Sequence, residues 1–544
     1  MSKTAASTPA SADPMQLDVI VVGAGFGGMY ALHKLRGQGL RARAFEAGSN
    51  VGGTWYWNRY PGARCDVESM EYSYSFSNDL QQAWHWPERY GTQAEILKYA
   101  NHVADRFDLR PMIEFNTRIV SAVFDEARGT WTATTHKGRR IEAPYCIMAC
   151  GNLSTPRVPA FKGLESFKGK WYHTGLWPHE GVDFTGLRVG VIGTGSSGIQ
   201  MIPIIAQQAK QLSVFQRTAN FSLPAHNGPL DPAAEKKHKS EYPERRKAAY
   251  DTPFGIAGYP PPTQSALDVS DAERNATYER KWQEGGTISF LYSYTDLLTN
   301  KEANDTASEF VRNKIRSIVK DKRTAELLCP NDHPIGTKRL CLDTHYYETY
   351  NRDNVSLIDA RSAPIQEITE KGIRTSDKEY EFDAIVFATG FDAMTGALND
   401  IDIRTSGGRT LKEKWAGGPL TYLGLLVAGF PNMFVITGPG SPGVKTQMIL
   451  SIEQHMDWIS DCLSFLRAKG KARIEAEESA ELEWVHHVND VAHSTLYPMA
   501  NSWYMGANIP GKPRVFMPYV GGVPSYKKKC DEVAAAGYSG CRLG

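Results

Sequence analysis

Two segments of this 544-residue chain place a glycine-rich turn directly after a short apolar run. Residues 18–22 lead into Gly23-Ala-Gly25-Phe-Gly-Gly28, and residues 188–192 lead into Gly193-Thr-Gly195-Ser-Ser-Gly198. A continuous apolar run is typical of a strand buried in a parallel sheet. Glycines after such a strand allow a tight turn, so that the backbone can approach a phosphate at the N-terminus of the following helix. The chain is therefore predicted to contain two dinucleotide-binding units of the α/β class.

The two units differ at the end of their second predicted strand. Glu46 ends the strand after the first turn, and Arg217 ends the strand after the second, each at the interval of about 20 residues expected for the group that meets the ribose. A carboxylate there binds ribose hydroxyls, whereas a guanidinium fits a 2′-phosphate. One site of each kind indicates FAD in the first unit and NADPH in the second.

The character of the chain changes inside the second unit. Between residues 224 and about 336 charged residues and helix starts dominate, which predicts a helical subdomain. Two capping-box patterns, Ser270 to Glu273 and Thr306 to Glu309, mark expected helix starts. The second is followed by an apolar face of Ala307, Val311, Ile315, Ile318 and Val319.

The expected organisation is two Rossmann-like domains with a helical insertion in the second. We assign residues 1–14 to a disordered tail, 15–153 and 390–544 to the FAD-binding domain, and 154–389 to the NADPH-binding domain. A strand is expected at residues 381–387, and an amphipathic helix near Ile452 to Leu466. The Pro/Gly-rich loop before that helix, residues 437–443, either presents N–H groups to an anion or is a connecting turn.

Composition excludes several classes of function. Lys and Arg number 61 against 60 Asp and Glu, so a basic surface for nucleic acid is not expected. None of the eight cysteines forms a CxxC pair, which argues against a zinc or dithiol site, and no metal is expected. No run of 18 apolar residues or signal peptide is seen, which predicts a cytoplasmic protein with no membrane contact and no evident obligate protein partner.

Three longer patterns resemble the type I Baeyer–Villiger monooxygenases. Phe167-Lys-Gly-Lys-Trp-Tyr-His173-Thr-Gly-Leu-Trp177-Pro178 matches the family fingerprint FxGxxxHxxx[WF]P, and it precedes the second glycine turn as it does in the family. Gly52 to Asp66 matches a further family pattern, and residues 382–392 resemble its late strand motif. The resemblance extends over nearly the whole chain and is closest to the phenylacetone and steroid monooxygenase branch. His173 is expected to make structural hydrogen bonds.

The resemblance implies which residues hold each cofactor. Those expected at FAD are Gly23, Gly25, Gly28, Glu46, Thr54, Trp55, Asp66, Tyr72, Ile119 through its backbone, and Met448 near the ring. Those expected at NADPH are Thr194, Gly195, Ser196, Ser197, Gly198, Gln200, Arg217, Thr218, Lys338, Arg339 and Trp503, the last resembling a mobile tryptophan that closes over the cofactor.

The resemblance also implies the chemistry, with Arg339 and Asp66 as catalytic residues. NADPH reduces the flavin, O2 then forms a C4a-peroxide, and this anion attacks a ketone to give an ester or lactone. A guanidinium at Arg339 would favour the anionic peroxide and stabilise the tetrahedral oxyanion. Asp66 would orient that guanidinium. Linear, aryl, cyclic and steroid ketones all remain open as substrates.

Three other functions compete with this interpretation. A flavin-containing N- or S-oxygenase shares the glycine turns, but it lacks the Trp55-to-Asp66 pattern and the arginine equivalent to Arg339. A disulfide reductase would need a redox-active cysteine pair. A nucleotide-binding sensor without turnover would have no use for Asp66 and Arg339.

Overall fold

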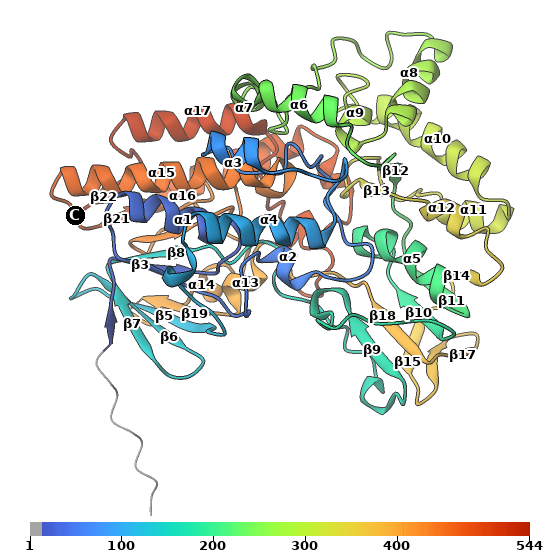
Figure 1. Ribbon diagram of the computed structural model, residues 1–544, viewed down its shortest axis with the longest axis horizontal. Helices are drawn as coiled ribbons and strands as arrows, with labels where there is room; N and C mark the ends of the chain where they lie inside the picture. The colour runs from blue at the N-terminus through green and yellow to red at the C-terminus, as the bar shows by residue number, and fades with distance from the viewer. Residues whose placement is uncertain (1–13, 406) are drawn as a thin grey trace, which may run out of the picture.

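A computed structural model of the chain describes residues 14–405 and 407–544 (Figure 1). The predicted tail, apart from Pro14, lies outside the described residues. The first nucleotide-binding unit is built on a parallel sheet whose strand order is β20 (Met433–Val435), β8 (Tyr145–Met148), β2 (Val19–Val22), β3 (Ala42–Phe45) and β4 (Ile113–Glu114). This sheet combines a strand from the C-terminal part of the chain with four from the N-terminal part.

A second parallel sheet forms the other unit. Its order is β14 (Val355–Asp359), β11 (Gln211–Gln216), β10 (Arg188–Ile192), β18 (Ala384–Phe387) and β9 (Lys170–His173). The single strand expected at residues 381–387 is two strands, β17 (Glu379–Glu381) and β18. The ladder breaks between them, where the Asp383 carboxylate accepts from the backbone N–H and guanidinium of Arg188. The two sheets confirm the predicted α/β class with two Rossmann-type units.

A third sheet packs on one face of the first. Its order is β1 (Met15–Gln16), β7 (Arg140–Ala143), β6 (Thr130–Thr135), β5 (Ile119–Asp125) and β19 (Asp402–Thr405). Trp131 and Phe124 of this sheet share a buried cluster with Ile20, Phe45 and Met433 of the first sheet. The first sheet is therefore covered on this face by strands.

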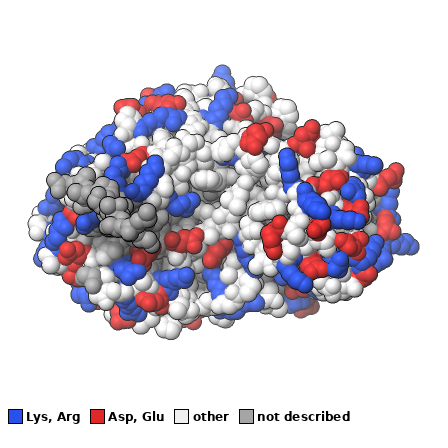
Figure 2. Space-filling view, turned by 90° about the horizontal axis from the view of Figure 1, so that it is seen from below, with Lys and Arg blue, Asp and Glu red and all other residues white. Residues whose placement is uncertain are grey.

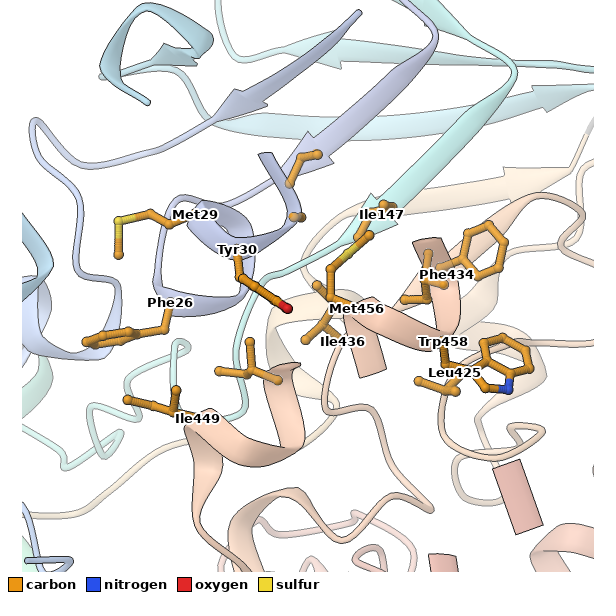
Figure 3. Packing of buried hydrophobic residues seen from close by; sticks show 14 of the residues in the cluster. Phe26, Met29, Tyr30, Ile147, Leu425, Phe434, Ile436, Ile449, Met456 and Trp458 are labelled. Carbon is orange, nitrogen blue, oxygen red and sulfur yellow. The ribbon is translucent and has the colours of Figure 1, made fainter. Parts of the chain in front are cut away.

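Helices cover the opposite face (Figure 3). Phe26, Met29 and Tyr30 of α1 (Phe26–Gly37) meet Ile449 and Met456 of α15 (Met448–Ala468) above the sheet. The expected amphipathic helix is α15, and it is buried along most of its length because α1 and α17 (Gly522–Ala535) pack against it. Trp484 and Val488 of α16 (Glu478–His493) belong to the same buried cluster. α4 (Gln93–Arg106) lies in the same layer (Figure 1).

The charged middle of the chain is helical, as expected. Its helices are α6 (Pro232–Ser240), α7 (Tyr242–Ala249), α8 (Asp271–Glu284), α9 (Thr287–Leu291), α10 (Lys301–Ile318) and α11 (Lys322–Leu328). Ser270 caps α8 as predicted. The second capping box is wrong: the N-cap of α10 lies six residues earlier, at Asn300, which accepts from the backbone N–H groups of Glu302 and Ala303. Thr306 lies inside α10 and its hydroxyl donates to the Ala303 carbonyl instead.

The helical segment also contacts the first unit. The Tyr242 hydroxyl donates to the Met70 carbonyl at 3.1 Å, and Arg246 donates to the Glu71 carbonyl at 2.9 Å.

No described helix has the length and apolar character needed to cross a bilayer. Lys and Arg are interspersed with Asp and Glu on the face drawn in Figure 2, as the near-neutral composition suggests.

Candidate active site

A cavity of about 990 Å³ is lined by residues of both nucleotide-binding units. From the first unit it takes the segment after α2 (Thr54–Trp57), including Asp66 and Tyr72. From the second it takes the glycine turn at 193–197, the end of β11 and the Lys338-Arg339 pair. The cavity therefore joins residues that the sequence assigns to FAD with residues that it assigns to NADPH.

Arg339 and Asp66 form a two-point ion pair in this cavity. The Arg339 Nε donates to Asp66 Oδ2 at 2.8 Å, and Nη2 donates to Oδ1 at 2.6 Å. Nη1 donates to the Val444 carbonyl at 2.8 Å. Burial disfavours the charge of Arg339, but the Asp66 carboxylate outweighs it and raises the pKa of Arg339 well above its ordinary value. The guanidinium is a fixed cation on a side chain that is 32% exposed in the cavity wall.

Hydrogen bonds within the loop and from α10 hold the loop that carries Arg339. The Thr337 hydroxyl donates to the Pro334 carbonyl at 2.6 Å, and Asn304 of α10 donates to the Ile335 carbonyl at 2.9 Å. Gly336 has a φ of +85°, and a side chain there would press on Leu291 and Leu298. The helical insertion thus positions the guanidinium, which explains why this subdomain belongs to the active site.

The two glycine turns have the geometry that a pyrophosphate requires. Gly23 and Gly193 adopt φ values of +101° and +111°. A Cβ on Gly28 would overlap the Gly23 carbonyl, and one on Gly198 would overlap the Gly193 carbonyl, so both positions need glycine for the helix to pack against its strand. A Cβ on Gly195 would enter open space, which leaves room for a ligand to approach the second turn.

Glu46 lies at the end of β3, directly beside the first turn. Its carboxylate is buried and accepts from the backbone N–H groups of Ala24 at 2.8 Å and Gly48 at 2.7 Å. Each carboxylate oxygen can accept a further hydrogen bond, so this position remains compatible with the predicted ribose contact.

Half of the residues expected at FAD line the cavity: Thr54, Trp55, Asp66, Tyr72 and Met448 do, whereas Gly23, Gly25, Gly28, Glu46 and Ile119 do not. The Trp55 indole N–H donates to the Tyr72 hydroxyl at 3.0 Å. Ile119 begins β5 and pairs with Thr135, away from the lining residues. Its role at the adenine remains a prediction.

Most residues expected at NADPH also line the cavity: Thr194, Gly195, Ser196, Ser197, Gln200, Arg217, Thr218, Lys338, Arg339 and Trp503. Gln200 additionally bridges the two units, since its amide donates to the Arg64 carbonyl at 3.0 Å and accepts from the Tyr60 hydroxyl at 2.8 Å. Lys338 pairs with Asp332 at 3.7 Å.

Several buried polar atoms in the cavity wall fit a bound cofactor. The Asn152 amide nitrogen and the Ser502 hydroxyl are buried, line the cavity and have no hydrogen-bond partner among the described residues. Buried polar groups are rarely left without a partner, so these atoms suit a ligand that supplies one. The sequence does not point to either residue, because an isolated Asn or Ser carries no spacing signal.

Lys445 lies near Arg339 and against two tyrosine rings. Its ammonium nitrogen lies 4.2 Å from the ring centre of Tyr497 and 4.6 Å from that of Tyr504. Burial and the neighbouring Arg339 lower the pKa of Lys445 well below its ordinary value. Tyr504 is itself buried beside Trp503, with ring centres 4.2 Å apart.

The Pro/Gly-rich loop at 437–443 acts as a connecting turn. The N–H of Thr437 donates to His455 Nδ1, that of Gly440 to the Met517 carbonyl and that of Ser441 to the Gly438 carbonyl. These amides are therefore occupied within the chain, which disfavours the anion-binding alternative.

His173 has the structural role expected of it. Its Nδ1 accepts from the Gly175 N–H at 3.0 Å, and its Nε2 lies 3.2 Å from the Thr389 hydroxyl. Burial lowers the pKa of His173 to about 4, so the ring is neutral at physiological pH.

The eight cysteines are free thiols, which leaves a disulfide reductase without its redox pair. Among the described residues, no group of His, Cys, Asp or Glu is arranged to hold a metal.

Known proteins share this architecture. A family model described as flavin-binding monooxygenase-like matches residues 16–226. A Baeyer–Villiger monooxygenase of Pseudooceanicola batsensis is 43% identical and covers 96% of this chain and 95% of its own length. A phenazine N-monooxygenase of Lysobacter antibioticus is 41% identical over 97% of each chain. A solved structure of oxidised steroid monooxygenase bound to NADP has a TM-score of 0.92 and 54% identity, and covers 97% of this chain and 99% of that one.

These similarities extend over almost the full length of the chain, and they agree with the two nucleotide-binding turns and the shared cavity. FAD and NADPH are accordingly the cofactors. The chain belongs to the type I Baeyer–Villiger monooxygenases, which oxygenate ketones to esters or lactones.

Proposed function

We propose that Arg339, oriented by Asp66, is the residue of this chain that stabilises the anionic oxygen when a ketone is converted to an ester or lactone. The observation that carries the proposal is the two-point ion pair in the wall of a cavity shared by both nucleotide turns. A side chain fixed in this way needs no reorganisation when negative charge develops, and such preorganised donors contribute strongly to catalysis.

The free donors of Arg339 support this role. A guanidinium has five N–H groups. Asp66 takes two and the Val444 carbonyl takes one, which leaves one N–H on each terminal nitrogen for a substrate oxygen. When bound, FAD supplies the oxygen-transfer chemistry. The chain's own residues hold the cationic site in place, and Trp503, Val444 and Met448 form an apolar part of the same cavity wall.

The same loop suggests the substrate class. Val444, Thr446 and Met448 line the cavity, whereas Gln447 is buried and caps α15 by accepting from the Leu450 N–H. The Lys445 amine is turned onto the two tyrosine rings. The side chains facing a substrate are therefore mainly apolar, and we propose a ketone with an uncharged, apolar body.

A second candidate is oxygenation of an aromatic nitrogen, which the name of the Lysobacter relative suggests. The case for this reaction is weaker, because the nucleophilic chemistry that a fixed guanidinium assists suits a carbonyl carbon.

We also propose a cytoplasmic location, since eight free thiols, six of them buried, are stable in a reducing compartment.

The test compares Arg339→Ala with the wild type on panels of ketones, amines and sulfides. We expect the variant to retain FAD, to keep consuming NADPH, and to lose ester formation by on the order of 100-fold or more, with hydrogen peroxide released instead. Arg361→Ala removes an arginine that does not line the cavity and serves as the control. Ester formation by Arg339→Ala at the wild-type rate would show that the proposed role is wrong.

A further inference from the structure

One end of the cavity gathers cationic side chains from three separate segments. Arg157 lies between β8 and β9, Arg217 follows β11, and Lys338 precedes Arg339; all three line the cavity. Among the described residues, the guanidiniums of Arg157 and Arg217 form neither an ion pair nor a side-chain hydrogen bond. Both side chains thus face the cavity without an anionic partner from the chain.

The nearby carboxylates are already committed to other cations. Asp332 is shared by Lys338 at 3.7 Å and Arg361 at 3.4 Å, and Asp392 pairs with Lys512 at 2.5 Å. Burial and the repulsion of Arg217 lower the pKa of Arg157. Burial, Arg217 and Arg361 likewise lower the pKa of Lys338. Arg157 and Lys338 are partly buried, and Arg217 is exposed. Neighbouring like charges are costly unless an anion compensates them, so this end of the cavity suits a multiply charged anion.

We propose that Arg157 is a further ligand of the NADPH 2′-phosphate and increases the preference of this chain for NADPH over NADH. The phosphate dianion offers three strong acceptor oxygens, which suit two guanidiniums and one ammonium. Arg217 approaches from the second unit, while Arg157 approaches from the segment that leads out of the first. This inference rests on the placement of NADPH at the second glycine turn.

The backbone of Arg157 is fixed, so only its side chain needs to adapt. Its N–H donates to the Gly390 carbonyl at 3.0 Å, and its carbonyl accepts from the Thr389 hydroxyl at 2.7 Å. These bonds tie the segment before β9 to the segment after β18. A 2′-phosphate held by Arg157 and Arg217 would therefore bind across the point where the chain passes between the two units.

The experiment measures equilibrium binding to FAD-loaded Arg157→Gln by calorimetry, with NADP+, NAD+, 2′,5′-ADP and 5′-AMP as ligands. Because a hydrogen bond between charged groups is lost, NADP+ and 2′,5′-ADP should bind about 10- to 100-fold more weakly, whereas NAD+ and 5′-AMP should change less than about 2-fold. Equal weakening of NAD+ and NADP+ would overturn the proposal, because Arg157 would then contact the pyrophosphate or adenine. Unchanged NADP+ binding would also overturn it.

Two controls separate the possible causes. Arg361→Gln removes the same charge near Asp332 but outside the cavity lining, and should change NADP+ affinity less than about 3-fold. An equal effect of both variants would mean a general charge effect and no contact. Arg217→Gln is the reference: if it also leaves the preference for NADP+ intact, the placement of NADPH itself fails. Should Arg157→Gln fold poorly, Arg157→Lys must retain a preference intermediate between wild type and Arg217→Gln.

Discussion

Arg339 and Asp66 meet through two hydrogen bonds although 273 positions separate them in the chain. Arg339 is carried by the second nucleotide-binding unit and Asp66 by the first, and the Val444 carbonyl adds a third segment to the contact. The position of the guanidinium thus depends on correct docking of the two units. An active site of this kind forms only in the fully assembled molecule.

Asp66→Asn should separate orientation from charge at Arg339. The amide keeps the shape of the side chain but removes the carboxylate that raises the pKa of Arg339 and balances its charge. We expect kcat for ester formation to fall by about 10- to 100-fold and the KM for ketone to change by less than about 3-fold, because the loss falls on the transition state. Steady-state kinetics with parallel hydrogen peroxide measurement check this. Asp402→Asn, in an exposed pair with Arg404, should have no effect; an unchanged kcat in Asp66→Asn would contradict the account.

Gly28→Ala and Gly198→Ala should affect different cofactors. Each added methyl group would overlap the carbonyl of the first glycine of its own turn. We expect Gly28→Ala to purify with less than about half of the wild-type FAD, and Gly198→Ala to retain FAD while binding NADP+ at least about 10-fold more weakly, as expected when a phosphate-binding backbone shifts. Absorbance spectra and titrations distinguish them. Gly37→Ala, at the open end of α1, is the matched control, and the reverse pattern would refute the assignment of the turns.

Lys445→Met should stabilise the protein in a pH-dependent way. The folded state lowers the pKa of Lys445, so the lysine costs stability at every pH below its unfolded value. That cost is largest below the folded pKa and disappears as the pH rises towards about 10.4. We expect the apparent Tm to rise by roughly 1–3 °C at pH 7 and by less at pH 9.

Thermal unfolding of the FAD-loaded enzyme at several pH values tests the Lys445 prediction. Lys469→Met is the control, because Lys469 is exposed and lies over a single ring, that of Phe465. A fall in Tm for Lys445→Met would mean that the contacts with Tyr497 and Tyr504 outweigh the cost of burial.

The sequence predicts the nucleotide-binding parts of this fold well because their signals are local. A buried strand, a glycine turn and a helix follow one another within about ten residues, and β2 and β10 lie where the apolar runs indicate. The start of α10 was missed because Asn300 competes with Thr306 as a cap, and the choice depends on packing. The place of Asn152 and Arg157 in the cavity wall, and the contact of Lys445 with two tyrosine rings, could not be found in this way. Each acts through neighbours distant in sequence, and only the assembled cavity shows what its side chain faces.

Oxygenation of ketones with the help of Arg339 is tested by incubating the wild-type enzyme with NADPH, isotopically labelled O2 and a panel of apolar ketones, followed by mass spectrometry of the products. We expect an ester or lactone that carries one labelled oxygen atom, with Arg339→Ala forming labelled hydrogen peroxide instead. An oxygenated amine or sulfide in the absence of any ester, or equal ester formation by both proteins, would contradict this expectation.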